Sequence, residues 1–296
     1  MARYIIRTKP GQATAVKGAL SAAGLKPLDS SLDFIFIDIP PEKVPVIEAL
    51  PGVIKVTPDR KVGIAAVMPV ETKVQEFYKR MKEPFGLPKA LAWARAQEAG
   101  AEKTPTSVAA EAMGATEAWA KGITGKGVKV AILDTGIDFL GPQMPLARAT
   151  SFVVGDPLGD DNNGHGTHTA TTIAGKKRGN LIGLAPDVTL RLIKTLGYLL
   201  GMGATSDIIK GMEEAEKWGA DIVSMSLGGD ASVAPEDDPM CIVIKEQTAK
   251  GMIYSIAAGN SGPGPQTVGS PGISPDAITV AALDIHGKVS DFSSRG

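Results

Sequence analysis

The sequence contains a single cysteine, Cys241, which excludes an internal disulfide. No neighbouring residue suggests a thiolate, so we expect this thiol to be a buried small hydrophobe. Aromatic residues make up only 5% of the chain, and 31 basic residues nearly balance 32 acidic ones, giving a formal net charge of -1. That balance argues against a nucleic-acid partner. No apolar run is long enough to span a bilayer, so no membrane partner is expected.

What the sequence does contain is typical of a packed α/β protein. Hydrophobic residues make up 43% of the chain. Its 296 residues leave room for a domain of ordinary size and a smaller one. We see no secretory signal, because Met1–Arg7 enters a strand pattern at once and has no apolar core of signal length. The chain is therefore expected to be intracellular or to begin after a removed signal.

Three segments place polar side chains at the ends of buried elements. The alternating apolar run 128–133 predicts a strand that ends in Asp134, at the edge where parallel sheets carry their chemistry. Alone, Asp134 would be interpreted as a turn former. His165 lies between two glycines before a helical pattern, and Asn260 follows the buried strand pattern 253–258. A carboxylate, an imidazole and an amide are the orienting acid, general base and oxyanion donor of acyl transfer.

Five motifs, taken together and in this order, resemble those of the subtilisin-like serine proteases, the subtilases. The resemblance covers roughly residues 106–296. It implies an α/β fold, with three layers around a parallel sheet, in which Asp134 is the triad acid, His165 the general base and Asn260 the oxyanion side chain. The motifs are Ala131–Ile137, Gly164–His168, Ser224–Gly229, Ala257–Gly262 and Asp291–Gly296.

The resemblance also implies two strand edges that flank an extended polypeptide substrate, and a pocket floor between them. An extended peptide held between two edges gains main-chain hydrogen bonds on both sides. Residues 226–228 have an alternative interpretation as a glycine-rich strand exit. The first edge is Met202, Gly203 and Ala204, the second is Ser226, Leu227 and Gly228, and the floor is Ala258, Gly259 and Asn260.

The nucleophile that the resemblance implies is missing from this sequence. In the family, a Gly-Thr-Ser turn follows the Phe-Ser-Ser segment, and no Gly-Thr-Ser occurs here. Ser107 is interpreted as a helix N-cap, and Ser293 and Ser294 are expected in a surface turn and make poor nucleophiles. We therefore expect a catalytic domain that is truncated before its serine and inactive as a 296-residue chain.

Residues 1–62 are predicted to form a separate α+β, ferredoxin-like domain, from a strand-helix-strand-strand-helix-strand order. It resembles the subtilase propeptide, which implies an intramolecular chaperone and inhibitor whose tail lies in the active-site cleft. A ferredoxin-like domain with another role is the alternative. The predicted strands are Tyr4–Arg7, Phe34–Ile39 and Val53–Val56, and the predicted helices are Gln12–Ala23 and Pro41–Leu50.

Residues 63–105 are predicted to be a helical linker or an N-terminal extension of the catalytic domain. Two helical patterns, Val74–Met81 and Lys89–Ala99, are separated by prolines and a glycine. We place the junction with the mature enzyme near Gly100–Lys103. The catalytic domain then covers 106–296, beginning with a predicted helix over Ser107–Lys121.

No cofactor is required for the predicted chemistry, and we predict no metal-binding residue. Calcium would have a structural role only, and the loops Leu140–Leu146 and Gly175–Ile182 offer few oxygen ligands for it. The segment Asp160–Asn163 is predicted to be a solvated turn. His168 is interpreted as a structural histidine packed behind His165.

These observations predict a secreted, monomeric serine endopeptidase zymogen that acts on polypeptides and has its own propeptide as a partner; an intracellular location is the alternative. A second hypothesis is a non-catalytic protein on the subtilase scaffold, either a pseudo-protease or an inhibitory or folding module. A nucleotide-binding domain is disfavoured, because the glycine cluster Gly122–Gly127 precedes a strand instead of following one.

Overall fold

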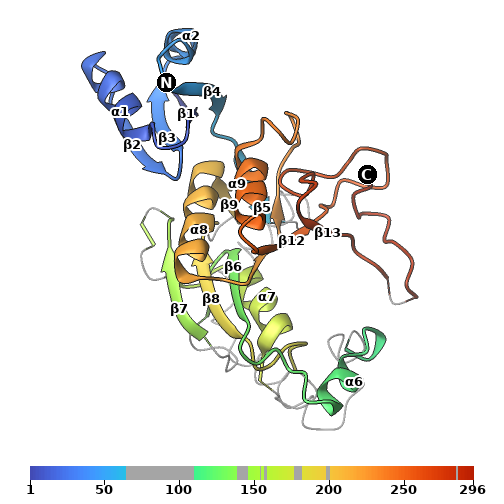
Figure 1. Ribbon diagram of the computed structural model, residues 1–296. Coiled ribbons are helices and arrows are strands. Elements are labelled where there is room, and N and C mark those ends of the chain that lie inside the picture. Colours follow the sequence, from blue (N-terminus) through green and yellow to red (C-terminus); the bar gives the residue numbers. More distant parts are fainter. Residues whose placement is uncertain are drawn as a thin grey trace, which may run out of the picture.

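The structure is a computed structural model that describes residues 1–64, 110–138, 146–153, 155–156, 159–176, 182–197, 201–284 and 286–296 (Figure 1). The helices predicted at Val74–Met81 and Lys89–Ala99, the N-cap Ser107 and the junction at Gly100–Lys103 lie outside these ranges.

The N-terminal unit is an antiparallel sheet with two helices on one face. The strand order is β2-β3-β1-β4, and the predicted alternation of strands and helices is the one observed. The hairpin strand β2 has no apolar pattern, and the sequence did not delimit it. The elements are β1 (Ala2–Thr8), α1 (Ala13–Ala22), β2 (Pro27–Ser31), β3 (Phe34–Ile39), a 3-10 turn (Pro41–Lys43), α2 (Val44–Glu48) and β4 (Val53–Pro58).

Strand β3 is apolar on both faces because each face packs against a different core. Ile35 and Ile37 belong to the cluster formed with α1 and α2. Phe34 and Phe36, one residue out of phase, belong to the cluster that contains the helices of the larger unit. Since side chains alternate across a strand, this one segment joins two cores.

The larger unit is built on a six-stranded sheet with the order β13-β12-β10-β6-β8-β7, in which every pairing is parallel. Connections between parallel strands need crossovers, and here these include α7, α8 and α9. The elements are α6 (Ala115–Ala120), β6 (Lys129–Asp134), β7 (Leu146–Ser151), α7 (His165–Ala174), β8 (Thr189–Lys194), α8 (Thr205–Trp218), β10 (Ile222–Met225), α9 (Pro239–Thr248), β12 (Ile253–Ala257) and β13 (Ile278–Val280).

Helices cover both faces of this sheet, so the predicted three-layer α/β fold is confirmed (Figure 1). Val130 and Ile132 of β6 pack in a cluster with α7. Ala131 and Leu133 of the same strand pack in the cluster with α8 and α9. The apolar run before Asp134 is therefore continuous because both of its faces are buried.

A third sheet joins the two units. Strand β5 (Lys61–Ile64) lies between β9 (Met202–Ala204) and β11 (Leu227–Gly228) and pairs antiparallel with both. Val62 pairs with Gly203, and Ile64 pairs with Leu227. The strand extends two residues past the predicted domain boundary at 62.

The predicted helix over Ser107–Lys121 is interrupted in its described part, where 110–112 and 115–120 are helical and 113–114 form a turn. Gly114 adopts a left-handed conformation, with φ of 70°, and α6 begins only at Ala115. The indole of Trp119 donates a hydrogen bond to the Leu184 carbonyl, 3.0 Å away, which attaches α6 to the loop before β8. A left-handed glycine interrupts the helix because it breaks the repeat of backbone hydrogen bonds.

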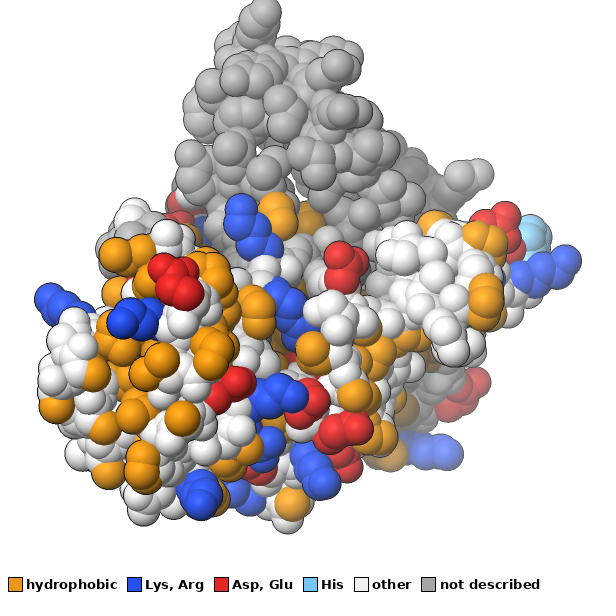
Figure 2. Space-filling view, turned by 90° about the horizontal axis from the view of Figure 1, so that it is seen from above, with side chains coloured by type: hydrophobic (Ala, Val, Ile, Leu, Met, Phe, Trp, Pro, Cys, Tyr) orange, Lys and Arg blue, Asp and Glu red, His pale blue; other side chains and the backbone are white. Residues whose placement is uncertain are grey.

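Two further surface properties follow from the described residues. No helix among them is long and apolar enough to cross a bilayer. Seen from above in Figure 2, basic and acidic side chains are mixed over the described surface, without a large area of one sign. Ion pairs of this kind cross the junction between the units, including Lys55–Asp237 at 2.9 Å and Lys210–Asp29 at 3.0 Å.

We expect Phe36→Ala to lower the free energy of unfolding by about 3–5 kcal/mol, because it leaves a cavity between the β3 face and α8. Phe36 is 1% exposed, and the Lys210 ammonium lies 5.3 Å from its ring centre. Urea unfolding followed by circular dichroism measures the loss. The control is Leu28→Ala at an exposed site, which should change stability by less than about 0.5 kcal/mol. Equal stability of both variants would contradict the described packing.

Candidate active site

Asp134 is the last residue of β6, and its side chain is fully buried. Its carboxylate accepts hydrogen bonds from the Thr135 backbone N–H at 2.7 Å and the Thr169 hydroxyl at 3.3 Å. A buried carboxylate needs such donors, because its charge has lost water. The predicted strand therefore does deliver a carboxylate to the carboxyl edge of the sheet.

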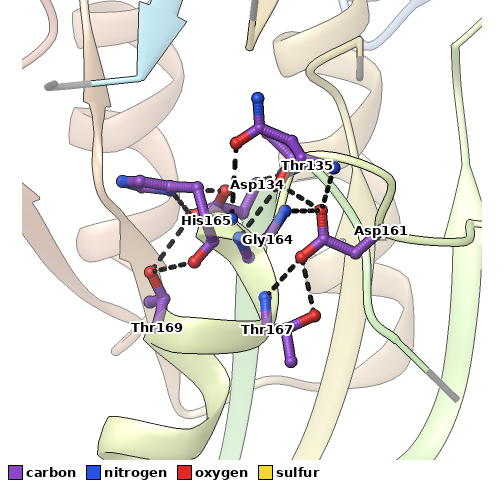
Figure 3. Close-up of polar contacts among 9 residues, drawn as sticks. Asp134, Thr135, Asp161, Gly164, His165, Thr167 and Thr169 are labelled. Carbon is purple, nitrogen blue, oxygen red and sulfur yellow. Dashed lines mark hydrogen bonds and ion pairs between the residues drawn. The ribbon is translucent and has the colours of Figure 1, made fainter. Parts of the chain in front are cut away.

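His165 is the first residue of α7, and its ring faces Asp134 (Figure 3). Its Nδ1 lies 2.7 Å from Asp134 Oδ1 and 3.0 Å from Oδ2. Because a carboxylate only accepts, Nδ1 carries the proton and Nε2 is left with a free lone pair. The imidazole is 25% exposed, so the base-competent nitrogen remains accessible.

Two glycines allow α7 to approach β6 this closely. A Cβ on Gly166 would lie 2.3 Å from the Gly136 carbonyl oxygen, which no side chain tolerates. Gly136 has φ of 115°, and a Cβ there would meet the Gly159 carbonyl at 2.5 Å. Gly136, which follows Thr135, and Gly166, which follows His165, are thus packing requirements of the Asp134–His165 contact.

The prediction that residues 160–163 form a solvated turn is wrong for Asp161. It is only 8% exposed, and it accepts five hydrogen bonds at the start of α7. Burial would raise the pKa of Asp161, but the donors, above all Thr167, hold it below the ordinary value. The residue before α7 is Gly164, which has no side chain to cap the helix, so Asp161 supplies that function.

Asn260 lies three residues beyond the end of β12. Its Nδ2 is buried and has no hydrogen-bond partner among the described residues. It lines a cavity of about 270 Å³. An unpaired buried amide donor is costly, so its presence beside a cavity indicates a site for an acceptor group.

The sheet order brings these groups to one edge. Asp134 ends β6 and Asn260 follows β12, and β10 lies between the two strands. Two strand spacings separate them by roughly 10 Å. The third element, α7, places His165 above the end of β6. The structure thus brings Asp134 and His165 into direct contact and places Asn260 at the same edge of the sheet.

The two predicted substrate edges lie on either side of β5, and one of them borders the cavity. Met202, Gly203 and Ala204 form β9, and Leu227 and Gly228 form β11, with β5 between them. Ser226 joins β10 to β11 and is half-buried. The cavity beside Asn260 is lined by Gly228 of the second edge, by Ala258 and Gly259 of the predicted floor and by Ile64 at the end of β5. The residues of the first edge do not line it.

Two predictions about individual side chains are wrong. Ser293 and Ser294 are buried, because the Ser293 Oγ accepts from the Ala282 N–H and the Ser294 Oγ accepts from the Ser261 N–H, each at 3.0 Å. The turn they form is a support of the Asn260 loop. His168 is exposed and does not pack behind His165, because it lies on the outer side of α7.

The prediction for Cys241 is confirmed. The cysteine is free and buried, and burial together with the nearby Asp238 carboxylate raises the pKa of its thiol to about 12. No group of three or more His, Cys, Asp or Glu side chains that could hold a metal ion occurs in the described ranges.

Sequence reasoning missed three contributors to the site. Thr135 bridges two elements, because its hydroxyl donates to Asp161 and accepts from the Gly166 N–H, both at 2.9 Å. Strand β5 was missed because its only signal is the short alternation of Val62 and Ile64. The signal for Asp161 was its position before the Gly-His-Gly segment, where an acidic residue stabilises a helix start.

The fold and the site together define an α/β domain with a carboxylate-oriented imidazole at the carboxyl edge of a parallel sheet. Residues 125–296, more than half of the chain, match the model of the Subtilase family (Peptidase_S8). The chain belongs to the subtilase family of serine proteases.

Three relatives from Bacillus subtilis (strain 168) are similar to part of this chain. The minor extracellular protease Vpr is 38% identical over 187 residues, 58% of this chain and 22% of the relative. The serine protease AprX is 39% identical over 197 residues, 59% of this chain and 44% of the relative. The major intracellular serine protease is 36% identical over 190 residues, 61% of this chain and 58% of the relative. The chain spans less than two thirds of each.

The depressed pKa of Asp161 predicts a pH-dependent contribution to stability. A lowered folded pKa stabilises the protein above the unfolded value of about 4, and this contribution is lost as pH falls through the folded pKa. Asp161→Asn should cost about 1–3 kcal/mol at pH 7 and remove part of the acid destabilisation of the wild type. Urea unfolding between pH 3 and pH 7 measures both. Asp276→Asn, an exposed carboxylate, is the control; a wild-type pH profile in Asp161→Asn would refute the assignment.

Proposed function

We propose that this site hydrolyses peptide bonds by acyl transfer to a serine, as an endopeptidase. The observation that carries the proposal is the Asp134–His165 hydrogen bond of 2.7 Å at the same sheet edge as the unpaired amide of Asn260. Membership of the subtilase family supports it. The sequence contains no Gly-Thr-Ser segment, so the presence of the attacking serine in the full-length protein is itself part of what we propose.

The residues take three roles in the proposed reaction. His165 Nε2 removes the proton from the serine hydroxyl as its oxygen attacks the substrate carbonyl, and it then gives that proton to the leaving amine. Asp134 fixes the Nδ1–H tautomer and stabilises the imidazolium formed in between. Asn260 Nδ2 donates to the oxyanion of the tetrahedral intermediate. Water, activated by the same imidazole, then releases the acyl group and restores the hydroxyl.

We predict that His165→Ala or Asp134→Ala abolishes self-processing of a full-length protein that carries the serine turn. Asn260→Ala should lower kcat by about 100- to 1,000-fold with little change in KM, a magnitude that comes from subtilisin itself. Release of a peptide chromophore measures kcat, and intact mass measures processing. Normal maturation of the His165 variant would sink the assignment.

We further propose that residues 1–64 act as an inhibitory segment and folding aid. Strand β5 occupies the groove between β9 and β11 in the manner of an extended peptide. Helix α8 begins after Ala204, which offers no cap, and Asp59 takes that role by accepting from the Ser206 N–H at 3.0 Å and its hydroxyl at 2.6 Å. An N-cap is worth about 1 kcal/mol, so the N-terminal unit favours formation of α8.

The position of β5 predicts where the protein processes itself. Ile64 lines the cavity that Asn260 also lines, so we expect the bond that is cut to come shortly after Ile64 in the sequence. N-terminal sequencing of the processed full-length protein should find a new terminus within about three residues after Ile64, since an extended chain advances about 3.3 Å per residue. A first cut at Gly100–Lys103 would contradict this register, and Asp134→Ala is the uncut control.

A non-catalytic protein on the same scaffold is the second candidate, favoured by the lack of a Gly-Thr-Ser segment in the printed sequence. Labelling by a fluorophosphonate separates the two functions, because only an activated serine reacts. We propose a monomeric, secreted enzyme that needs no cofactor, in line with the relative named as extracellular. Another relative is named as intracellular, so cell fractionation decides the location.

A further inference from the structure

The connector between β4 and β5 carries a charged side chain into the larger unit. Arg60 lies beside the start of α9, and its guanidinium makes three contacts there. One terminal nitrogen, Nη2, lies 2.5 Å from Asp238 Oδ2, and the other, Nη1, donates to the Asp230 carbonyl at 3.0 Å and to the Ser232 hydroxyl at 2.9 Å. The guanidinium therefore uses both arms of its fork on separate acceptors.

Asp238 is fully buried, and its two oxygens have different tasks. Oδ1 caps α9 by accepting from the Met240 N–H at 2.9 Å and the Cys241 N–H at 3.3 Å. Oδ2 accepts from the Ser270 hydroxyl at 2.7 Å and from Arg60. Arg60 is the only cation paired with Asp238 in the described part of the chain. Without it, the buried carboxylate would lose its counter-charge.

The backbone shows that the Arg60 position belongs to the same groove as β5. The Arg60 carbonyl accepts from the Thr205 N–H at 2.9 Å, directly before the pairing of Lys61 with Ala204. These contacts involve main-chain atoms of the inserted segment, so any extended peptide in the same register reproduces them. The residue that replaces Arg60 then lies against Asp238, beside a groove of about 320 Å³ that Arg60 itself lines together with Ser232 and Ser270.

We propose that Asp238, Ser232 and the Asp230 carbonyl form a subsite for an arginine of the polypeptide substrate. That arginine is the fourth residue before the one that pairs with Leu227, as Arg60 is the fourth before Ile64. The subsite selects arginine over lysine, because an ammonium cannot reach acceptors on both sides with a planar fork. This inference rests on the proposed peptidase function. It assigns a preference for arginine at a substrate position remote from the bond that is cut.

The first experiment uses the processed full-length enzyme and peptides that differ only at this position. A peptide with arginine should have a kcat/KM about 10- to 100-fold above its alanine counterpart, and lysine should fall between them. Asp238→Asn, which keeps a capping side chain, should remove most of that difference. Ser232→Ala, at an exposed site that does not affect folding, should reduce the preference for arginine over lysine. Equal kcat/KM for the arginine and alanine peptides would overturn the subsite.

The second experiment uses the intact chain and needs no catalysis, so it separates failure of the subsite from failure of the proposed function. Arg60→Ala should speed hydrogen exchange of the β5 amides at Gly63 and Ile64 by about 10-fold or more. The matched control is Lys61→Ala, which removes the same charge from an exposed neighbour. If the enzyme hydrolyses nothing, this comparison alone decides. Equal exchange in the two variants overturns the subsite, and a selective increase in Arg60→Ala supports it.

Discussion

The contact between the start of α7 and the end of β6 is the constraint on which the site depends. The imidazole of His165 reaches Asp134 only because the helix begins almost on top of the strand exit. Small residues permit that approach, but they also leave the helix without a capping side chain. Asp161 solves this problem from the preceding loop, and Thr135 links its carboxylate to the backbone of α7. The orientation of the His165 imidazole therefore depends on the hydrogen bonds of Asp161 and Thr135 beneath it.

The two units are joined through one sheet face and two strand edges that would otherwise be uncovered. The N-terminal sheet buries one face on its own helices and offers the other, with Ile5, Phe34 and Phe36, to the core around α8 and α9. The chain then leaves β4 and completes a sheet between β9 and β11, whose edges would otherwise expose unpaired backbone groups. Under the proposed function, a peptide substrate would need the same main-chain hydrogen bonds that β5 makes with β9 and β11.

The sequence was sufficient for the parts of this architecture that rest on strong local patterns. The strand ending at Asp134, the strand at Phe34–Ile39 and the helical pattern after the Gly-His-Gly segment were predicted from the residues, and the structure contains all three. The family, through its motifs, was recognised correctly.

The rest could not be predicted because it depends on contacts between distant residues. From the sequence alone, Asp161 resembles an acidic residue of an exposed loop, because its hydrogen-bond donors come from the end of β6 and from α7. Ser293 and Ser294 resemble exposed residues, because the Asn260 loop that covers them is distant in the sequence. Strand β5 has only four residues, and its pairing partners lie about 140 and 160 positions along the chain. Gly114 ended a helix that periodicity alone would have continued.

Adjacent residues of the connector, Asp59 and Arg60, act on the first turns of two different helices. The acid receives the Ser206 amide of α8, and the base neutralises the carboxylate that caps α9. Exchanging the two residues would bring a cation to the positive pole of one helix and a second anion to Asp238, so both contacts would become repulsive at once. The order of these two charges therefore marks the register of the inserted segment: a shift by one residue in one direction brings Asp59 to Asp238, and a shift in the other direction brings Arg60 to the start of α8.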